Sequence, residues 1–87
     1  MRYQIVEVFE VQQRGAVAVV REHTTIPAGK ALRATLVRPD GSRLVATASK
    51  EFLLRRHLLP QESEAFLLRG VPKPQVPEGS WIELEEP

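Results

Sequence analysis

The chain has 87 residues, a formal net charge of +1 at pH 7 and no cysteine. This length allows a single domain, residues 1–87, with one modest hydrophobic core. The lack of cysteine excludes disulfides and thiolate metal sites, and the near-neutral charge argues against a protein that binds nucleic acid over its whole surface.

Neither a metal site nor a targeting segment is predicted. The two histidines, His23 and His57, lie far apart and lack the spacing of a shared metal site. No apolar run approaches the roughly 18 residues of a membrane span, and the first residues do not resemble a secretory leader. We therefore expect a soluble, cytoplasmic protein with no metal and no cofactor.

The N-terminal residues predict a β-hairpin. Residues 3–11 alternate as a strand does, with Glu7 as the only interruption of the apolar face. That face carries Tyr3, Ile5, Phe9 and Val11. Gly15 marks a tight turn, and the run rich in β-branched residues at 16–20 is typical of a second strand.

A second hairpin is predicted further along the chain. Gly29 marks a turn that launches an alternating strand at residues 30–38, and residues 44–48 return. The tip is predicted at Asp40 and Gly41, because aspartate hydrogen-bonds the backbone ahead and glycine accepts a left-handed conformation.

Residues 50–59 are ambiguous. A short amphipathic helix would suit their composition, whereas the neighbouring short strands favour a strand followed by a loop, which is our prediction. Residues 64–69 and 80–85 are the last two predicted strands. Seven short strands with turns about every 8 to 12 residues predict an all-β fold. We expect a small closed or nearly closed antiparallel β-barrel of six to seven strands.

Three prolines, Pro72, Pro74 and Pro77, separate the last two strands. Because proline fixes φ and lacks an N–H donor, this link should cross the end of the barrel without extending either strand. Gly70 and Gly79 are expected to form turns near its two ends. We interpret the link as a device that closes the barrel.

Five segments occur in a recognisable order. They are FEVQQRGAVAVV (9–20), IPAGKALRATL (26–36), KEFLLRR (50–56), FLLRGV (66–71) and VPEGSWIEL (76–84). Together they resemble the second domain of elongation factor Tu and related translational GTPases. The resemblance implies a barrel of the translation-factor domain II type, here as a stand-alone domain, and by analogy contact with RNA or a ribonucleoprotein.

No catalytic constellation is recognisable. The chain lacks the Gly-x-x-x-x-Gly-Lys-Ser/Thr loop that cradles phosphates, so we expect no GTP binding. Asp40 is the only aspartate, and no Gly-x-Ser-x-Gly elbow or cysteine nucleophile is present. The sequence therefore indicates a noncatalytic binding module rather than an enzyme.

The candidate nucleic-acid-binding residues are basic, and they are Lys50, Arg55, Arg56, His57 and Arg69. Arginine and lysine contact phosphates, and arginine also stacks on bases. The alternative for the cluster at 50–57 is a solvated face, and the alternative for Arg69 is a structural role at the barrel edge.

The competing functional hypothesis is a protein-interaction module. It would dock through an apolar face or a sheet edge, and a homodimer is one form that it could take. Trp81, the only tryptophan, is expected to fill the core with Ile82 or Leu84 facing outward. An exposed Trp81 would instead indicate a stacking or docking surface.

Overall fold

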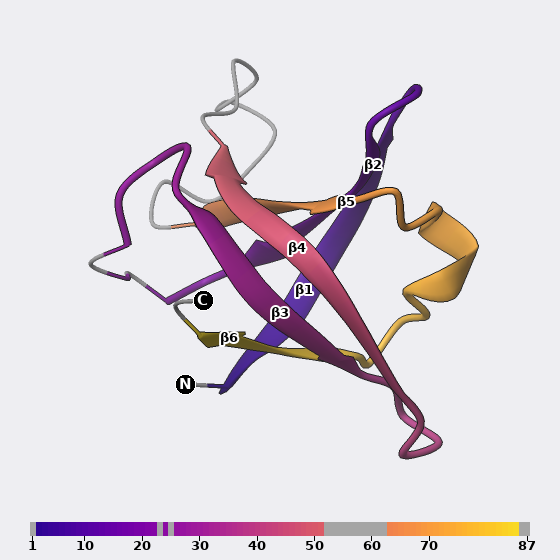
Figure 1. Ribbon diagram of the computed structural model, residues 1–87. Helices are drawn as coiled ribbons and strands as arrows, with labels where there is room; N and C mark the ends of the chain where they lie inside the picture. Colours follow the sequence, from indigo (N-terminus) through magenta and orange to yellow (C-terminus); the bar gives the residue numbers. More distant parts are fainter. Residues whose placement is uncertain (1, 23, 25, 52–62, 86–87) are drawn as a thin grey trace.

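The computed structural model describes residues 2–22, 24, 26–51 and 63–85 (Figure 1). This part of the chain contains six strands and one short 3-10 helix. In chain order they are β1 (Arg2–Val11), β2 (Gly15–Val20), β3 (Ala31–Val37), β4 (Arg43–Glu51), β5 (Glu64–Arg69), the 3-10 helix η2 (Lys73–Gln75) and β6 (Trp81–Glu85).

The six strands form a closed antiparallel barrel in the order β1-β2-β5-β4-β3-β6. Every described strand therefore has a hydrogen-bonded neighbour on each side. The predicted all-β, closed antiparallel barrel is confirmed, with six strands in the described part. At the ambiguous segment, Lys50 and Glu51 continue β4, and residues 52–59 lie outside the described residues.

Small and large side chains face one another inside the barrel. Ala18 pairs with Phe66 across β2 and β5, and Leu68 lies between Ala16 and Ala48. All five side chains are almost completely buried. A barrel of six strands has a narrow interior, so the alanines opposite Phe66 and Leu68 let the sheet close without a clash at these positions.

The strands β2 and β5 are buried on both faces. A second apolar cluster lies on the outer side of these strands, and it comprises Val17, Val19, Ala65 and Leu67, with Phe9 and Val11 packed against it. The alternate positions of both strands point into the main core. This double burial explains why both strands are continuous apolar runs rather than alternating ones.

A bulge in β1 changes which residues share a face. Ile5 pairs with Val20 but Glu7 pairs with Val19, so β1 carries one extra residue at this point. Tyr3 and Ile5 therefore face the main core, whereas Phe9 and Val11 pack on the outer cluster. The prediction that these four residues share one face is wrong, because an extra residue reverses the alternation beyond it.

The β3–β4 hairpin has its tip where the sequence predicts it. The Arg38 N–H donates to the Ser42 carbonyl at 2.9 Å, and the Gly41 N–H donates to the Arg38 carbonyl at 2.9 Å. The Ser42 N–H donates to Asp40 Oδ1 at 2.8 Å. The aspartate side chain thus stabilises the turn, as expected of this residue type.

The proline-rich link closes one end of the barrel. The strands β5 and β6 lie opposite each other in the ring, so residues 70–80 cross that end (Figure 1). Val71 and Val76 are buried in the main core on either side of η2. Arg38 of the hairpin reaches the link, where its Nε donates to the Gln75 carbonyl at 2.9 Å. These contacts agree with our interpretation of the link as a closure device.

Candidate functional site

The predicted site residue Lys50 takes part in an internal polar network. Its side chain is 19% exposed, and its Nζ lies 3.3 Å from Oε1 of Glu64. The same Nζ donates to the Ile26 carbonyl at 3.1 Å. A lysine in this position stabilises the crossing from β2 to β3 and has little capacity left for an external phosphate.

Glu64 is the centre of this network. Its side chain is 9% exposed, and the backbone N–H of Thr24 donates to its Oε2 at 2.9 Å, while the Thr24 hydroxyl donates to Oε1. Burial alone would raise the pKa of Glu64. The hydrogen bonds from Thr24 and Lys50 outweigh burial and lower the pKa below its ordinary value. Glu64 is therefore held as a carboxylate.

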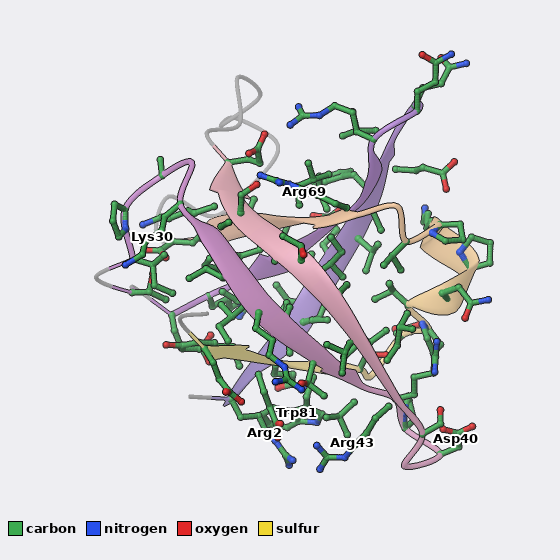
Figure 2. All side chains as sticks on the ribbon, viewed as in Figure 1. Arg2, Lys30, Asp40, Arg43, Arg69 and Trp81 are labelled. Atoms are coloured by element: carbon green, nitrogen blue, oxygen red, sulfur yellow. The ribbon has the colours of Figure 1, made fainter. Side chains whose placement is uncertain are left out.

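Of the other predicted basic residues, the structure describes only Arg69. Arg55, Arg56 and His57 lie outside the described residues. Arg69 is exposed at the end of β5, opposite Gly15, and it makes no ion pair with any described residue. Figure 2 shows it well away from Arg2, Arg43 and Trp81.

The predicted turn residues occupy distinctive backbone positions. Gly15, Gly29, Gly41, Gly70 and Gly79 all have positive φ. Gly15 is the most constrained of them, because a Cβ there would lie 2.1 Å from the Leu68 carbonyl oxygen. Only glycine permits this approach of β2 to β5.

Trp81 lies on the outside of the barrel. It is 37% exposed, whereas its neighbours Ile82 and Leu84 are buried. The prediction that Trp81 fills the core is wrong, because the pairing of β6 with β1 and β3 turns Ile82 and Leu84 inward. An exposed tryptophan is typical of a stacking or docking surface.

Trp81 belongs to a continuous outer surface over four strands, here named the Trp81 face. Its members are Arg2 and Gln4 of β1, Trp81 and Glu83 of β6, Thr35 and Val37 of β3, and Arg43 and Val45 of β4. Val45 is the most exposed large apolar side chain of the described residues, at 54%. The face therefore combines exposed apolar groups with two arginines.

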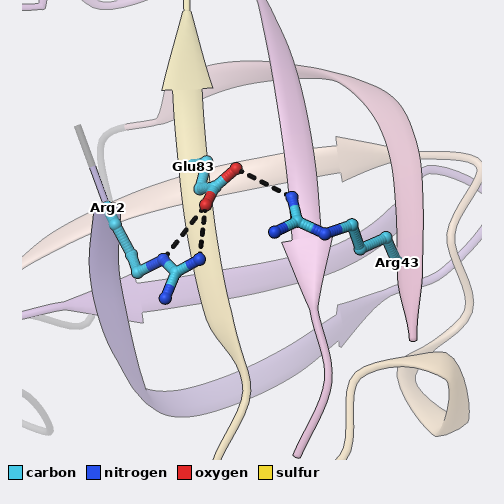
Figure 3. A network of polar contacts seen from close by, with 3 residues as sticks. All are labelled: Arg2, Arg43 and Glu83. Carbon is cyan, nitrogen blue, oxygen red and sulfur yellow. Dashed lines mark hydrogen bonds and ion pairs between the residues drawn. The ribbon is translucent and has the colours of Figure 1, made fainter. Parts of the chain in front are cut away.

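One carboxylate orients both arginines of this face (Figure 3). Arg2 donates to Oε2 of Glu83 through Nε at 3.0 Å and Nη2 at 2.7 Å. Arg43 donates to Oε1 through Nη1 at 3.2 Å. The hydrogen bond from Arg2 is the largest cause of a lowered pKa at Glu83, and the charge of Arg43 adds to it. The triad holds two guanidinium groups beside the exposed indole.

Part of this face could have been recognised from the sequence. In WIELE, Trp81 shares alternation with Glu83 and Glu85, whereas Ile82 and Leu84 share the opposite alternation. Two glutamates on the tryptophan side indicate that this side faces water. The pairing of Arg2 with Glu83 joins residues 81 positions apart, and no local pattern indicates it.

The described residues and the comparisons add three findings. No helix in the described part has the length and apolarity needed to cross a membrane. The described ranges also contain no group of three or more His, Asp or Glu that could hold a metal ion. Comparison of the chain with protein-family models, with curated proteins and with solved structures gives no match in any of the three.

Proposed function

We propose that this chain is a noncatalytic binding module that docks a protein partner on the Trp81 face. The observation that carries the proposal is that exposed Trp81 shares one outer face with exposed Val45 and with two arginines that Glu83 holds in place. Tryptophan and arginine are the residues most enriched among those that dominate binding energy in protein interfaces. Aliphatic neighbours such as Val45 suit a protein surface better than a nucleic-acid base.

Docking through a face is favoured over docking through a sheet edge. Addition of a partner strand requires a strand with unpaired backbone groups. Each of the six described strands has a paired neighbour on both sides, although β1 meets β6 only over residues 2–4 and β4 meets β5 only over residues 48–51. Because no described strand is unpaired along a whole side, the side chains of the Trp81 face are the better supported means of contact.

A capture experiment tests the proposal. The wild-type domain, Trp81→Ala and Arg69→Ala are immobilised and exposed to native lysate of the source cells, with and without nuclease. We expect the wild type and Arg69→Ala to retain at least one protein after nuclease treatment. The amount of that protein retained by Trp81→Ala should be about tenfold lower. Circular dichroism during thermal unfolding checks that Trp81→Ala is folded. Equal capture by all three baits would contradict docking at this face.

Contact with RNA or a ribonucleoprotein is the second candidate. It is supported by the resemblance to translation-factor domain II and by exposed Arg69, which has no carboxylate partner among the described residues. An exposed guanidinium at a strand end can contact a phosphate. In the same experiment, partners that are lost both on nuclease treatment and with Arg69→Ala would favour RNA.

A further inference from the structure

The arginines of the Trp81 face have unused capacity to bind an anion. Each guanidinium has five N–H donors, and the contacts with Glu83 use two from Arg2 and one from Arg43. Two positive charges also share a single carboxylate. Both arginine side chains are about half exposed, at 48% for Arg2 and 55% for Arg43. The triad therefore has an excess positive charge that a partner can reach.

The surroundings of the triad favour a discrete carboxylate over a polyanion. Glu83 lies between the two guanidinium groups, and Glu85 follows it on the same side of β6. These carboxylates repel a chain of closely spaced phosphates, whereas a single carboxylate can take the free N–H donors of one arginine in a bidentate contact. Trp81 and Val45 provide apolar contact area beside it.

We infer that the Trp81 face binds a partner segment that presents acidic and aliphatic side chains together on one side. The inference rests on the proposed docking function and specifies the chemistry of the partner. Its carboxylates pair with Arg2 and Arg43, and its aliphatic groups pack on Trp81 and Val45. Charge complementarity selects the acidic segment, and apolar burial supplies affinity that is independent of salt.

Trp81 is the only tryptophan, so its fluorescence reports directly on this surface. The probes are a blocked hexapeptide of sequence LLEELL, which carries both leucine and glutamate on each side when extended, the same peptide with glutamine in place of glutamate, and a ten-nucleotide oligouridylate. We expect the acidic peptide to bind at least about tenfold more tightly than the glutamine peptide, and the difference to shrink as salt is raised.

Variants separate the charge preference from docking itself. The double variant Arg2→Gln/Arg43→Gln should remove the preference for the acidic peptide, while Arg14→Gln should retain it. Arg14 is a matched control, because it too is half exposed and forms an ion pair at 3.2 Å, with Glu51. Val45→Asp keeps the fluorophore and should weaken binding of both peptides. Thermal unfolding by circular dichroism checks the fold of each variant.

Several results would overturn the inference. Equal affinity for the two peptides, with both weakened by Val45→Asp, would overturn the acidic preference and leave the docking proposal standing. No binding of either peptide at about millimolar concentration, or tighter binding of oligouridylate, would overturn the inference. A wild-type dimer in sedimentation that Val45→Asp dissociates would also overturn it, because the occupant would then be a second copy of this chain.

Discussion

The two ends of the barrel are closed by chain crossings that are held in different ways. At one end, the connection from β2 to β3 is fixed by Glu64, which accepts hydrogen bonds from Thr24 and pairs with Lys50. At the other end, residues 70–80 are fixed by buried Val71 and Val76 together with three prolines. One closure depends on a paired buried charge, and the other on apolar burial and a stiff backbone.

This difference predicts different responses to perturbation. A buried carboxylate costs free energy when it loses its partner, and its contribution depends on its protonation. Apolar burial and restriction of the unfolded chain by proline are independent of pH. Substitutions at the two ends should therefore differ both in size and in pH dependence.

The largest effect is expected at Gly15, where β2 begins beside the proline-rich link. Gly15→Ala would place a Cβ 2.1 Å from the Leu68 carbonyl oxygen, at a φ of +139°. We expect the free energy of unfolding to fall by about 4 kcal/mol, from the clash and the backbone strain together. Urea denaturation followed by circular dichroism measures this change.

Gly29→Ala is the matched control at the other end of the barrel. Gly29 also has positive φ, at +81°, but a Cβ there has nothing within 4 Å. Only the backbone strain remains, so we expect a loss of about 1 kcal/mol. Equal losses at the two glycines would show that the close approach of β2 to β5 is not a constraint on the fold.

Removal of the charge at Lys50 is expected to have the next largest effect. Lys50→Met keeps much of the side-chain volume but removes the ammonium group that lies 3.3 Å from the 9% exposed Glu64 carboxylate. We expect a loss of about 2 kcal/mol at neutral pH, because the hydrogen bonds from Thr24 remain. Lys73→Met, at an exposed position of η2, is the control and should change stability by less than about 0.5 kcal/mol. A similar loss in both variants would contradict a special role for the buried pair.

Acid pH should weaken the end of the barrel that Glu64 holds closed, but not the end that residues 70–80 close. The pKa of Glu64 is lowered in the folded state, so its contribution is complete above the ordinary pKa of glutamate and is lost as pH falls through the lower, folded-state pKa. The difference in free energy of unfolding between wild type and Glu64→Gln should therefore narrow between about pH 7 and about pH 3. Asp40 and Glu83, whose pKa values are also lowered, are present in both proteins and cancel. A constant difference over this range would show that the charge of Glu64 does not stabilise the fold.

The local features of the fold could be predicted from the sequence because local chemistry determines them. Asp40 and Gly41 form the hairpin tip through contacts within four residues, and the alternation of residues 30–38 gives the inward face of β3. The fold class followed from the spacing of such strands and turns. These predictions required no knowledge of which strands are neighbours.

The features that were predicted wrongly or missed depend on pairing between distant strands. The bulge in β1 can be recognised only from the pairing of β1 with β2. Beyond Ile5 it reverses which residues of β1 face outward. Trp81 faces water because β1 and β3 set the register of β6. Lys50 looks like a surface cation in the sequence, and its partner Glu64 follows β4 by 13 residues. The Trp81 face therefore depends on strand pairing that the sequence does not reveal, and three residues of the predicted basic cluster, Arg55, Arg56 and His57, lie outside the described residues.

The smallest change in the free energy of unfolding is expected at the prolines. Its independence of pH distinguishes the end closed by residues 70–80 from the end held by Glu64. Pro74 lies exposed within η2, so Pro74→Ala removes few contacts and acts mainly by giving the unfolded chain more freedom. We expect a loss of about 0.5 to 1 kcal/mol that is the same at neutral and acid pH. Urea denaturation at both pH values measures this loss. Glu64→Gln is measured in parallel, because its effect on the free energy of unfolding is expected to change with pH. A loss at Pro74 that depended on pH would mean that the link is coupled to a titrating group, because the entropy of the unfolded chain has no such dependence.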